Sequence, residues 1–549
     1  MTNAGSIGAV VLRSVGVDRE PAGKALAGLA LGAPRWADVE IPQPAVHDRR
    51  RAAVAALASL RRGRSGDLTR PMRRTLAAAW ASVRAFRIDD GLAAANRLEP
   101  LLADLAESAA TAARSELDVL RATALAAADA PAAALAFARR AIGGASPGPA
   151  GPLAAMVIRF AFWRAGDLEG FHAQGRPSLS APQCRRGRLC IAFDRAVEAA
   201  WEAQQLRFAT SRRLAEDALE IADGACARPN PAGLLAAAVL AEVAYEAGDM
   251  EAARRLLEPC LSRLRTHASA DSAARIYPLA ARLAAARGEL QFAVMLLREG
   301  EQLGERRNWP RLIAACLQER VGLYLADGRS VDAGDCADRL SLLAAQAPAT
   351  AHLNELTTAA VLASCRVALA AEPGRDVVAR LRQLHHDAVA RDDLHLAVRV
   401  SVRLAEALAA VGDAAEAAVV LARGLAVAAD TGLYQTFLDG GARVGELVAE
   451  LSAAPGHACR IDAYADHLAR HWPRAERAAQ ASQRSSGPLS ARECAILRLM
   501  SRGFSNKQVG RELGIAFETV KTHAKNIYGK LDAANRAEAV ARAERLGLI

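Results

Sequence analysis

The sequence predicts an all-α protein, and three observations favour that fold class. Only 4% of the residues are aromatic, whereas the strands of β-sandwiches and barrels favour aromatic and β-branched side chains. Alanine, leucine and arginine dominate the composition, and all three are good helix formers. Apolar residues also recur at the i, i+3, i+4 spacing of amphipathic helices. A chain of 549 residues that is 52% hydrophobic is long enough for several domains or for one long array of repeats.

Residues 1–75 form an N-terminal arm whose structure the pattern leaves open. Val10–Leu12 and Val39–Ile41 fit either short strands or an extended arm. Arginines cluster between residues 49 and 74, as a solvated helix face or as a second patch that contacts phosphates. The chain has no basic-then-apolar leader, and no apolar run reaches 18 residues without a charge. We therefore expect a cytoplasmic protein with no membrane partner.

A turn centred on glycine recurs along residues 76–472, which predicts helical repeats. The best matches are Gly166, Gly248, Gly288, Gly328 and Gly412, spaced 82, 40, 40 and 84 residues apart. Weaker matches lie near Asp89–Asp90, Ala128–Asp129, Gln205–Leu206 and Pro373–Gly374.

An apolar helix precedes each of these glycines and an amphipathic helix follows it. Glycine suits the turn because it takes a positive φ without steric cost. An Asp or Glu after the glycine, such as Asp249 after Gly248, favours the positive end of the next helix. Pro259 should kink or shorten the helix that follows Gly248. Such two-helix units cannot bury their apolar faces alone, so they must stack into a superhelix.

The repeat pattern resembles a tetratricopeptide-like array of eight or nine units between about residues 76 and 455. Its last stretch, Leu421–Gly441, resembles the repeat ahead of the DNA-binding domain in the large ATP-dependent LuxR-type activators. A nucleotide site is not evident here, because Gly23–Ala25 lacks the earlier glycine and the Ser or Thr of a P-loop.

No other motif indicates an enzyme, a metal site or a cofactor. The nine cysteines are scattered singly, and we expect them to act as small buried hydrophobes. His385 and His386 are expected to form a polar patch on a repeat helix. Residues 473–488 are rich in Arg, Gln and Ser and predict a linker.

Residues 489–549 carry half of the net charge of +10, since they contain eleven basic and six acidic residues. Three capping patterns begin helices here: Ser490 with Glu493, Ser505 with Gln508, and Asn535 with Glu538. Gly503 and Gly514 stand where helices should end. The pattern predicts four helices, at 491–502, 506–513, 517–531 and 536–546.

The third of these helices has the pattern of a recognition helix, which enters the major groove of DNA. The predicted core of the domain is Ile496, Leu497, Met500, Phe504, Val509, Leu513, Ile515, Val520, Ile527, Tyr528 and Leu531. Cations and hydrogen-bonding side chains are then left facing outward, at Thr519, Lys521, Thr522, Lys525 and Asn526. The last helix carries an apolar face that a small domain need not cover, formed by Ala539, Val540, Ala543 and Leu546.

The C-terminal region resembles the LuxR-type (GerE-type) helix-turn-helix domain from end to end. Five blocks carry the resemblance: Leu489–Glu493 (LSARE), Gly503–Lys507 (GFSNK), Thr519–His523 (TVKTH), Asn526–Leu531 (NIYGKL) and Arg536–Val540 (RAEAV). The resemblance implies that Lys521, Thr522 and Lys525 read bases. It implies that Asn506, Lys507 and His523 contact the DNA backbone, and that the last helix forms a dimer.

Two residues depart from the family pattern, and Phe517 beside the second is unusual. Gly510 replaces the usual alanine, and Ala516 replaces the Ser or Thr that caps the recognition helix. Phe517 is unusually apolar for its position, and it either touches a thymine methyl group or packs against the linker. These departures would weaken the domain's stability or its DNA affinity, but they leave the motif recognisable.

These patterns indicate a DNA-binding transcriptional regulator with no enzymatic activity. The expected partners are double-stranded DNA, a second copy of the chain bound through the last helix, RNA polymerase, and an effector or protein on the repeat surface. The alternative from another class is a repeat scaffold for protein binding whose DNA-binding domain is secondary or degraded. A nucleotide-driven activator is a third possibility, and it would need an ATP site of unfamiliar sequence.

Overall fold

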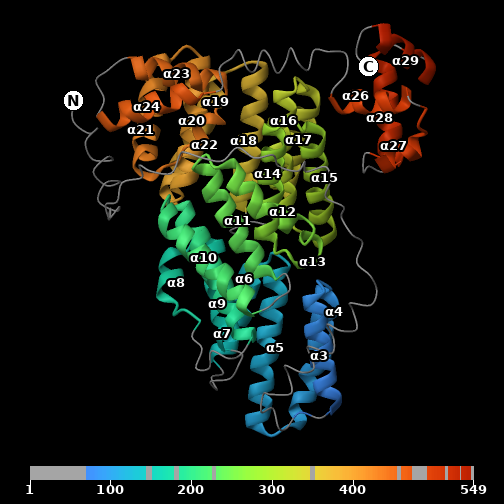
Figure 1. Cartoon of the computed structure of the whole chain (residues 1–549). Coiled ribbons are helices and arrows are strands. Elements are labelled where there is room, and N and C mark those ends of the chain that lie inside the picture. The colour runs from blue at the N-terminus through green and yellow to red at the C-terminus, as the bar shows by residue number, and fades with distance from the viewer. Residues whose placement is uncertain are drawn as a thin grey trace. The chain divides into compact units, whose positions relative to one another are not determined.

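The computed structural model describes the repeat region and the C-terminal helices. The described residues are 68, 70–143, 151–177, 185–225, 230–346, 353–453, 459–472, 491–501, 503–512, 517–531, 533 and 535–545. These residues form helices and turns and contain no strand, so the prediction of an all-α protein is confirmed (Figure 1). The stretches Val10–Leu12 and Val39–Ile41, most of the arginine cluster and the predicted linker lie outside them.

Nine helix pairs follow one another through the described part of the repeat region (Figure 1). The pairs are α3 (Arg70–Arg84) with α4 (Ile88–Leu98), α5 (Glu107–Ala127) with α6 (Pro131–Gly143), α7 (Gly151–Ala165) with α8 (Leu168–Ala173), α9 (Arg185–Gln204) with α10 (Phe208–Ala225), α11 (Pro231–Glu246) with α12 (Met250–Leu261), α14 (Ala270–Ala286) with α15 (Leu290–Arg307), α16 (Pro310–Ala326) with α17 (Ser330–Gln346), α18 (Leu353–Ala371) with α19 (Arg375–Ala390), and α20 (Leu394–Ala410) with α21 (Ala414–Thr431). Short helices η2 (Glu99–Asp104), α13 (Leu264–His267) and α22 (Gln435–Leu438) connect some of them, and α23 (Ala442–Ala453) and α24 (Cys459–His471) follow.

Five of the nine pairs contain the left-handed glycine turn that the sequence predicts. Gly166, Gly248, Gly288, Gly328 and Gly412 all have φ between +69° and +88°. The residue after the glycine donates its backbone N–H to a carbonyl five residues earlier, as Asp249 does to Ala244 at 2.9 Å. This hydrogen bond satisfies a carbonyl that the end of the first helix would otherwise leave unpaired.

Within three other pairs the turn has the same left-handed geometry without a glycine, and Asn308 and Asp392 take it between pairs. Asp129 and Leu206 take φ of +63° and +58°, which confirms two of the weaker matches. The match near Asp89–Asp90 was misplaced, because those residues lie in the first turn of α4 and the turn itself is at Phe86, with φ of +55°. At the Pro373–Gly374 match the turn differs, since Gly374 has an extended φ of −124°.

Acidic side chains begin the second helix of several pairs, as expected. Asp167, Asp249 and Asp413 each accept a hydrogen bond from a backbone N–H three residues later, whereas Glu289 makes no such bond. Pro259 lies within α12, which ends two residues later at Leu261 and is shorter than the neighbouring α15 and α17. The predicted shortening of this helix is therefore confirmed.

The first helix of a pair is buried on most sides, and this explains why the repeats are so apolar. Nearly every residue of α11 from Leu234 to Val243 is buried against its neighbours. Five of the cysteines, Cys190, Cys260, Cys316, Cys336 and Cys365, are free thiols in this core, as the sequence predicts. Arg70, Arg73 and Arg74 lie exposed on α3, and His385 and His386 lie on α19.

Contacts also join helix pairs that are far apart in the sequence. The indole Nε1 of Trp309, at the start of α16, donates to the carbonyl of Ala127 at 2.9 Å. The guanidinium of Arg311 binds the carboxylate of Asp129, with an Nε–Oδ2 distance of 2.9 Å, and both side chains are buried. Helices α9 and α20 are also in contact. The repeat array therefore turns far enough for later pairs to pack against earlier ones.

A buried network of charges holds one of these long-range contacts together. Besides Asp129, Arg311 binds Asp271 at 2.9 Å, and Arg164 from α7 binds the same carboxylate at 3.3 Å. Glu355 from the start of α18 accepts hydrogen bonds from both arginines. Burial alone would raise the pKa of Glu355, but the two guanidinium groups hold that pKa well below its usual range. The network therefore joins elements from five different helix pairs.

Substituting the turn glycines tests whether the left-handed turn limits stability. In Gly288→Ala the new Cβ meets open space, so we expect only the left-handed strain of about 1–2 kcal/mol. In Gly248→Ala the Cβ would also lie 2.8 Å from Cδ1 of Tyr434, so the loss should be larger. Urea denaturation followed by circular dichroism measures both losses. Equal midpoints for the two variants would contradict the role of the Tyr434 contact.

Candidate nucleic-acid interface and repeat cavity

The C-terminal helices end within one residue of the predicted positions. They are α26 (Ala491–Ser501), α27 (Asn506–Glu512), α28 (Phe517–Lys530) and α29 (Arg536–Arg545). The core contains nine of the eleven predicted residues, seven of them fully buried and Phe504 and Tyr528 partly so. The other two, Leu513 and Ile515, lie outside the described residues. Ala524, Ala539 and Ala543 are also buried in this core, although the sequence analysis did not include them.

Two of the three predicted capping patterns are present, and they fix where the helices begin. The amide of Ser505 donates to Oε1 of Gln508 at 2.8 Å, and the amide of Gln508 donates back to Oγ of Ser505. The amide of Glu538 donates to Oδ1 of Asn535 at 3.0 Å. Gly503 ends α26 with a φ of +90°. The third predicted cap, Ser490, and the predicted stop at Gly514 lie outside the described residues.

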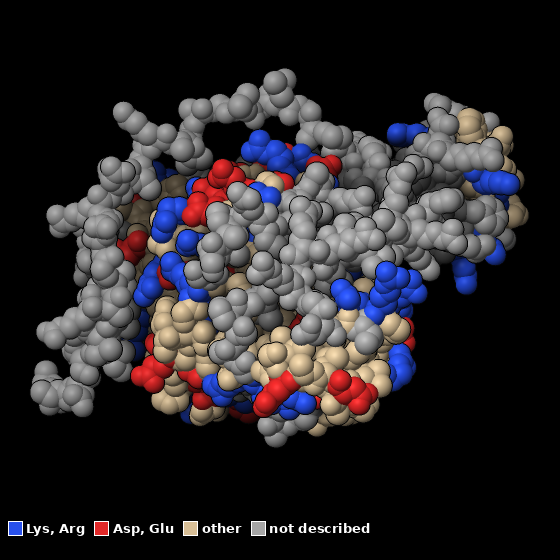
Figure 2. All heavy atoms as spheres, turned by 90° about the horizontal axis from the view of Figure 1, so that it is seen from below, with Lys and Arg blue, Asp and Glu red and all other residues tan. Residues whose placement is uncertain are grey.

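Helix α28 buries one face and exposes two lysines on the other. Val520, Ala524 and Ile527 are buried in the core, whereas Lys521 and Lys525 are exposed. Four residues apart on a helix, these two lysines project from the same side. Thr519, Thr522 and Asn526 lie on the same helix, but their side chains are outside the described part of the domain. Figure 2 shows blue Lys and Arg side chains on the described part of these C-terminal helices, at the right of the view.

The three residues expected at the DNA backbone are also accessible. Lys507 is exposed on α27, and Asn506 and His523 are partly exposed. Lys507 stands one residue after the start of α27, the helix that precedes α28. The structure therefore leaves all of the predicted contact residues whose side chains are described reachable from solvent.

Among the basic side chains that the structure describes in this domain, Arg536 and Arg542 bind carbonyls at the ends of other helices. Arg536 donates to the carbonyl of Met500 near the end of α26. Arg542 donates to the carbonyl of Leu531 just after α28, at 2.9 Å. Both arginines lie on α29 and are partly buried. They satisfy carbonyls at the ends of two helices, where a cation also interacts favourably with the helix dipole.

The expected apolar dimer face on α29 needs a correction. Ala539 and Ala543 are fully buried in the domain's own core, and Val540 packs against it. Leu546 lies outside the described residues. A face at Ala539 and Ala543 is therefore unavailable to a second copy, because α29 packs this side against α26 and α28. The exposed side of α29 carries Ala537, Ala541 and Arg545 instead.

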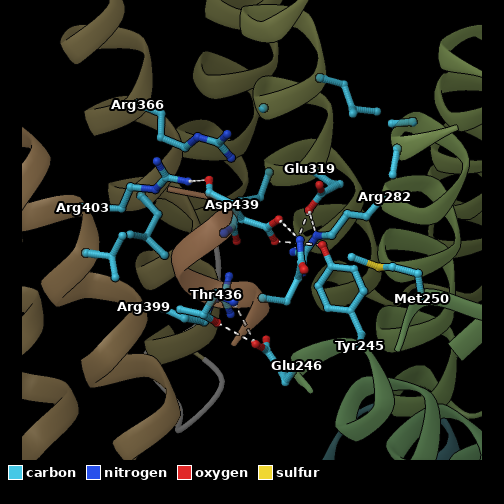
Figure 3. Close-up of a pocket in the computed structure, with 18 residues that line it drawn as sticks. Tyr245, Glu246, Met250, Arg282, Glu319, Arg366, Arg399, Arg403, Thr436 and Asp439 are labelled. Carbon is cyan, nitrogen blue, oxygen red and sulfur yellow. Dashed lines mark hydrogen bonds and ion pairs between the residues drawn. The ribbon is translucent and has the colours of Figure 1, made fainter. Parts of the chain in front are cut away.

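A cavity of about 310 Å³ lies within the repeat array and was not predicted from the sequence. Its walls come mainly from the first helices of successive pairs, α11, α14, α16, α18 and α20, together with Met250 of α12 and the α22 region (Figure 3). Charged side chains line it: Glu246, Arg282, Glu319, Arg366, Arg399, Arg403 and Asp439. They come from different repeats, so no local motif joins them. The one sequence feature that could have indicated the cavity is a charged residue that recurs within otherwise apolar helices.

Glu246, in the wall of this cavity, links α11 to the α22 region and to α20. It lies at the end of α11, and its carboxylate accepts hydrogen bonds from the amide and hydroxyl of Thr436 at 3.1 and 2.9 Å. Nε2 of His395 lies 3.1 Å from the same carboxylate. Burial would raise the pKa of Glu246, but His395 and Thr436 lower it below its usual value. These contacts hold α22 against α11, four helix pairs earlier in the chain (Figure 3).

No helix in the described part of the chain is long and apolar enough to cross a membrane. Among the same residues, no group of His, Cys, Asp and Glu side chains could hold a metal ion.

Comparison with known families identifies two regions of the chain. Residues 487–543 match the family of bacterial regulatory proteins of the LuxR type, and residues 192–454 match the MalT-like TPR region. These are the two resemblances that the sequence motifs indicate, and both are confirmed.

Individual relatives support the same two regions. The HTH-type transcriptional regulator MalT of Vibrio cholerae is 32% identical over 168 residues, which cover 26% of this chain and 18% of that protein. MalT of Vibrio campbellii is 49% identical over 61 residues, or 11% of this chain and 7% of that protein. The matched parts of this chain thus span less than a fifth of these relatives. Among solved structures, a Rap protein complexed with competence and sporulation factor aligns with a TM-score of 0.48 and 14% identity, covering 66% of this chain and 98% of that one.

Removing the cap of α29 tests how the last helix is held. Asn535→Ala removes the acceptor for the amide of Glu538, which should cost about 1 kcal/mol. In the full chain, peptides covering residues 535–545 should then exchange amide hydrogens faster when followed by mass spectrometry. Peptides from α14 serve as the internal control and should not change. Unchanged exchange in α29 would show that the cap does not limit its opening.

Proposed function

Because the chain carries a LuxR-type DNA-binding domain and a MalT-like TPR region, homologous to the C-terminal part of MalT, we propose that it is a sequence-specific transcriptional regulator whose repeats sense an effector. DNA binding and transcription regulation follow from the family of the C-terminal domain. Sequence reading by particular residues, dimerisation and effector sensing are the parts that we propose.

The distribution of lysines along the sequence is the main support for this proposal. It has only five lysines, and four of them stand between residues 507 and 530: Lys507, Lys521, Lys525 and Lys530. Everywhere else after Lys24 its basic residues are arginines. A compact ammonium on a flexible stem differs from the planar guanidinium in geometry and hydration. Lysine at these positions therefore suggests a specific contact rather than general surface charge.

We assign base reading to α28 and backbone contact to α27. Lys521 and Lys525 are exposed on one side of α28, with Thr522 between them in the sequence. Lysine can donate to O6 and N7 of guanine in the major groove. Thr519 and Asn526 complete the proposed reading face of α28. Asn506, Lys507 and His523 would contact phosphates, which position the protein on the duplex.

A second copy of the chain is the proposed partner on DNA. Since Ala539 and Ala543 are buried within the domain, the contact would use the exposed side of α29, at Ala537, Ala541 and Arg545. RNA polymerase is a further proposed partner. We propose no catalytic activity for the chain.

The alternative of a scaffold with a degraded DNA domain has little support. It rests on Gly510, which lies within α27, and on Ala516, which lies outside the described residues. The buried core, two of the caps and the exposed lysines are those of an intact domain.

Two lysine variants separate base reading from backbone contact. Lys521→Ala should lower binding to the operator much more than binding to random DNA, because a good base contact is worth about 1–3 kcal/mol of discrimination. Lys507→Ala should weaken both equally and reduce the salt dependence by about one unit per lost phosphate contact. Titrations of both duplexes at several salt concentrations measure this. Equal losses on both DNAs for Lys521→Ala and Lys507→Ala would contradict the assignment of Lys521.

Footprinting tests the proposed dimer. Two recognition helices related by a two-fold axis should protect half-sites about one helical turn, roughly 10 bp, apart. Hydroxyl-radical cleavage of operator DNA with the full-length protein should show two such protected patches. Ala541→Glu should weaken operator binding and lose the paired pattern, whereas Ala85→Glu, in the α3–α4 turn, serves as a control. A single protected patch at saturating protein would exclude the dimer.

A further inference from the structure

Most charged groups in the repeat cavity have a partner of opposite charge or a carbonyl. Arg282 from α14 binds Glu319 from α16, with an Nε–Oε2 distance of 2.8 Å. The hydroxyl of Tyr245 donates to Asp439 at 2.8 Å. Arg403 donates to the carbonyls of Asp439 and Gly440 and also binds Glu406 at 2.9 Å. These groups are therefore compensated without a ligand.

Arg366 and Arg399 differ from the other cavity arginines. Both are partly buried, and neither forms a hydrogen bond or an ion pair with the described residues. Burial, with repulsion from Arg403 second, lowers the pKa of Arg366 to about 10. Burial, with repulsion from Arg282 second, also lowers the pKa of Arg399. The fold thus holds two guanidinium groups in a setting that disfavours their charge.

The two arginines line the same cavity from neighbouring helix pairs and share Glu319 as a neighbouring charge. Figure 3 shows Arg366 and Arg399 on the same side as Arg403, on α18 and α20. Both act on the same carboxylate, because Arg366 and Arg399 each help Arg282 to lower the pKa of Glu319 against the effect of burial. Room for one of them is provided by a glycine: a Cβ at Gly322 would lie 2.6 Å from Nη1 of Arg366. A side chain at residue 322 would therefore displace this guanidinium.

We propose that the repeat cavity binds a small anion, whose carboxylate or phosphate group receives hydrogen bonds from Arg366 and Arg399. The inference deepens the proposed function, because it rests on the repeats being the effector-sensing part. A guanidinium carries five donors in a fork that matches the oxygens of carboxylates and phosphates. Burying a cation without a direct hydrogen-bonding partner is costly, so a bound anion would complete this site.

The cavity also limits what the rest of the ligand can be. Its volume of about 310 Å³ is at the small end of ligand pockets, which run from ~300 to 1,000 Å³. Tyr245, Met250 and Leu362 offer apolar surface, while Glu319 and Gln318 can accept hydrogen bonds. The fitting ligand is therefore a metabolite-sized anion with hydrogen-bond donors of its own, rather than a peptide or a nucleic acid.

Ligand binding would act on the same long-range contact that closes the cavity. Both α20 and the α22 region line the cavity that would hold the ligand. Arg399 and Arg403 belong to α20, and Thr436 and Asp439 belong to the α22 region. An anion at Arg366 and Arg399 would remove the repulsion that α18 and α20 bear toward α14. Binding should consequently stabilise the closed arrangement of α11, α20 and α22.

Thermal unfolding of the full chain tests this proposal with inorganic phosphate and malonate as probes. In a phosphate-free buffer each anion is titrated through the millimolar range, with sodium chloride at matched ionic strength as the reference. We expect a saturable rise of the midpoint temperature, because a ligand that binds only the folded state stabilises it. A rise with phosphate alone, malonate alone or both supports the site and identifies the group that it prefers.

Three variants and a matched control locate the binding. Arg366→Met and Arg399→Met should each weaken the anion's affinity about tenfold or more, as expected for the loss of charge-assisted hydrogen bonds. Neither should lower the midpoint without anion, because each removes a buried cation that has no hydrogen bond or ion pair with the described residues. Gly322→Ala keeps both charges but displaces Arg366, and it should weaken the affinity as well. Arg298→Met, which changes an exposed arginine on α15, should leave it unchanged.

The outcomes separate this inference from the proposed function. The inference is overturned if neither anion raises the midpoint beyond chloride, or if Gly322→Ala and the arginine variants bind as the wild type does. Operator binding is measured on the same samples with and without the anion. Saturable binding that leaves operator affinity unchanged would keep the anion site and contradict its role as effector.

Discussion

Buried charge has to be compensated, and this constraint organises the repeat region. Arg311, Arg164 and their carboxylate partners come from distant helix pairs, so each ion pair fixes how far the superhelix has turned. Breaking one such pair would leave the other charge buried alone, which costs more than the pair contributes when intact. The network therefore specifies the curvature of the array more than it adds to its stability. The cavity exists because of that curvature: α22 reaches α11 only if the intervening pairs stack at the right angle.

The local geometry that makes this curvature possible lies in the turns. Each left-handed residue directs the second helix back along the first, and the hydrogen bond across the turn leaves no carbonyl unpaired. Where glycine is absent, Asp129, Leu206 and Phe86 bear the strain of the same conformation. At Leu206 the side chain is buried in the core around α20, so packing offsets the strain. Asp129 offsets it through its ion pair with Arg311.

Local patterns allowed most of the fold to be predicted, and non-local contacts explain what was missed. Helix ends near residues 503, 505 and 535 follow from glycines and capping side chains, which act within a few residues. The cavity depends on residues such as Glu246 and Thr436, which are 190 residues apart and share no motif. The burial of Ala539 and Ala543 was missed for a similar reason: alanine fits an exposed or a buried face, and only packing decides which. From the sequence, Arg536 and Arg542 likewise count among the basic residues available to DNA. The structure shows instead that both donate to carbonyls within the domain.

Arginine and lysine are used for different purposes in this chain. In the repeats the buried and long-range ion pairs use arginine, whose fork can bind two acceptors at once, as Arg311 and Arg403 do. In the C-terminal domain Arg536 and Arg542 again bind carbonyls within the fold. Among the side chains that the structure describes, the exposed cations on α27 and α28 are lysines. An exposed lysine ammonium on its flexible stem stays hydrated, whereas the forked guanidinium of arginine readily binds nearby carbonyls and carboxylates. Arginine therefore makes the contacts within the fold, whereas lysine supplies exposed charge on α27 and α28.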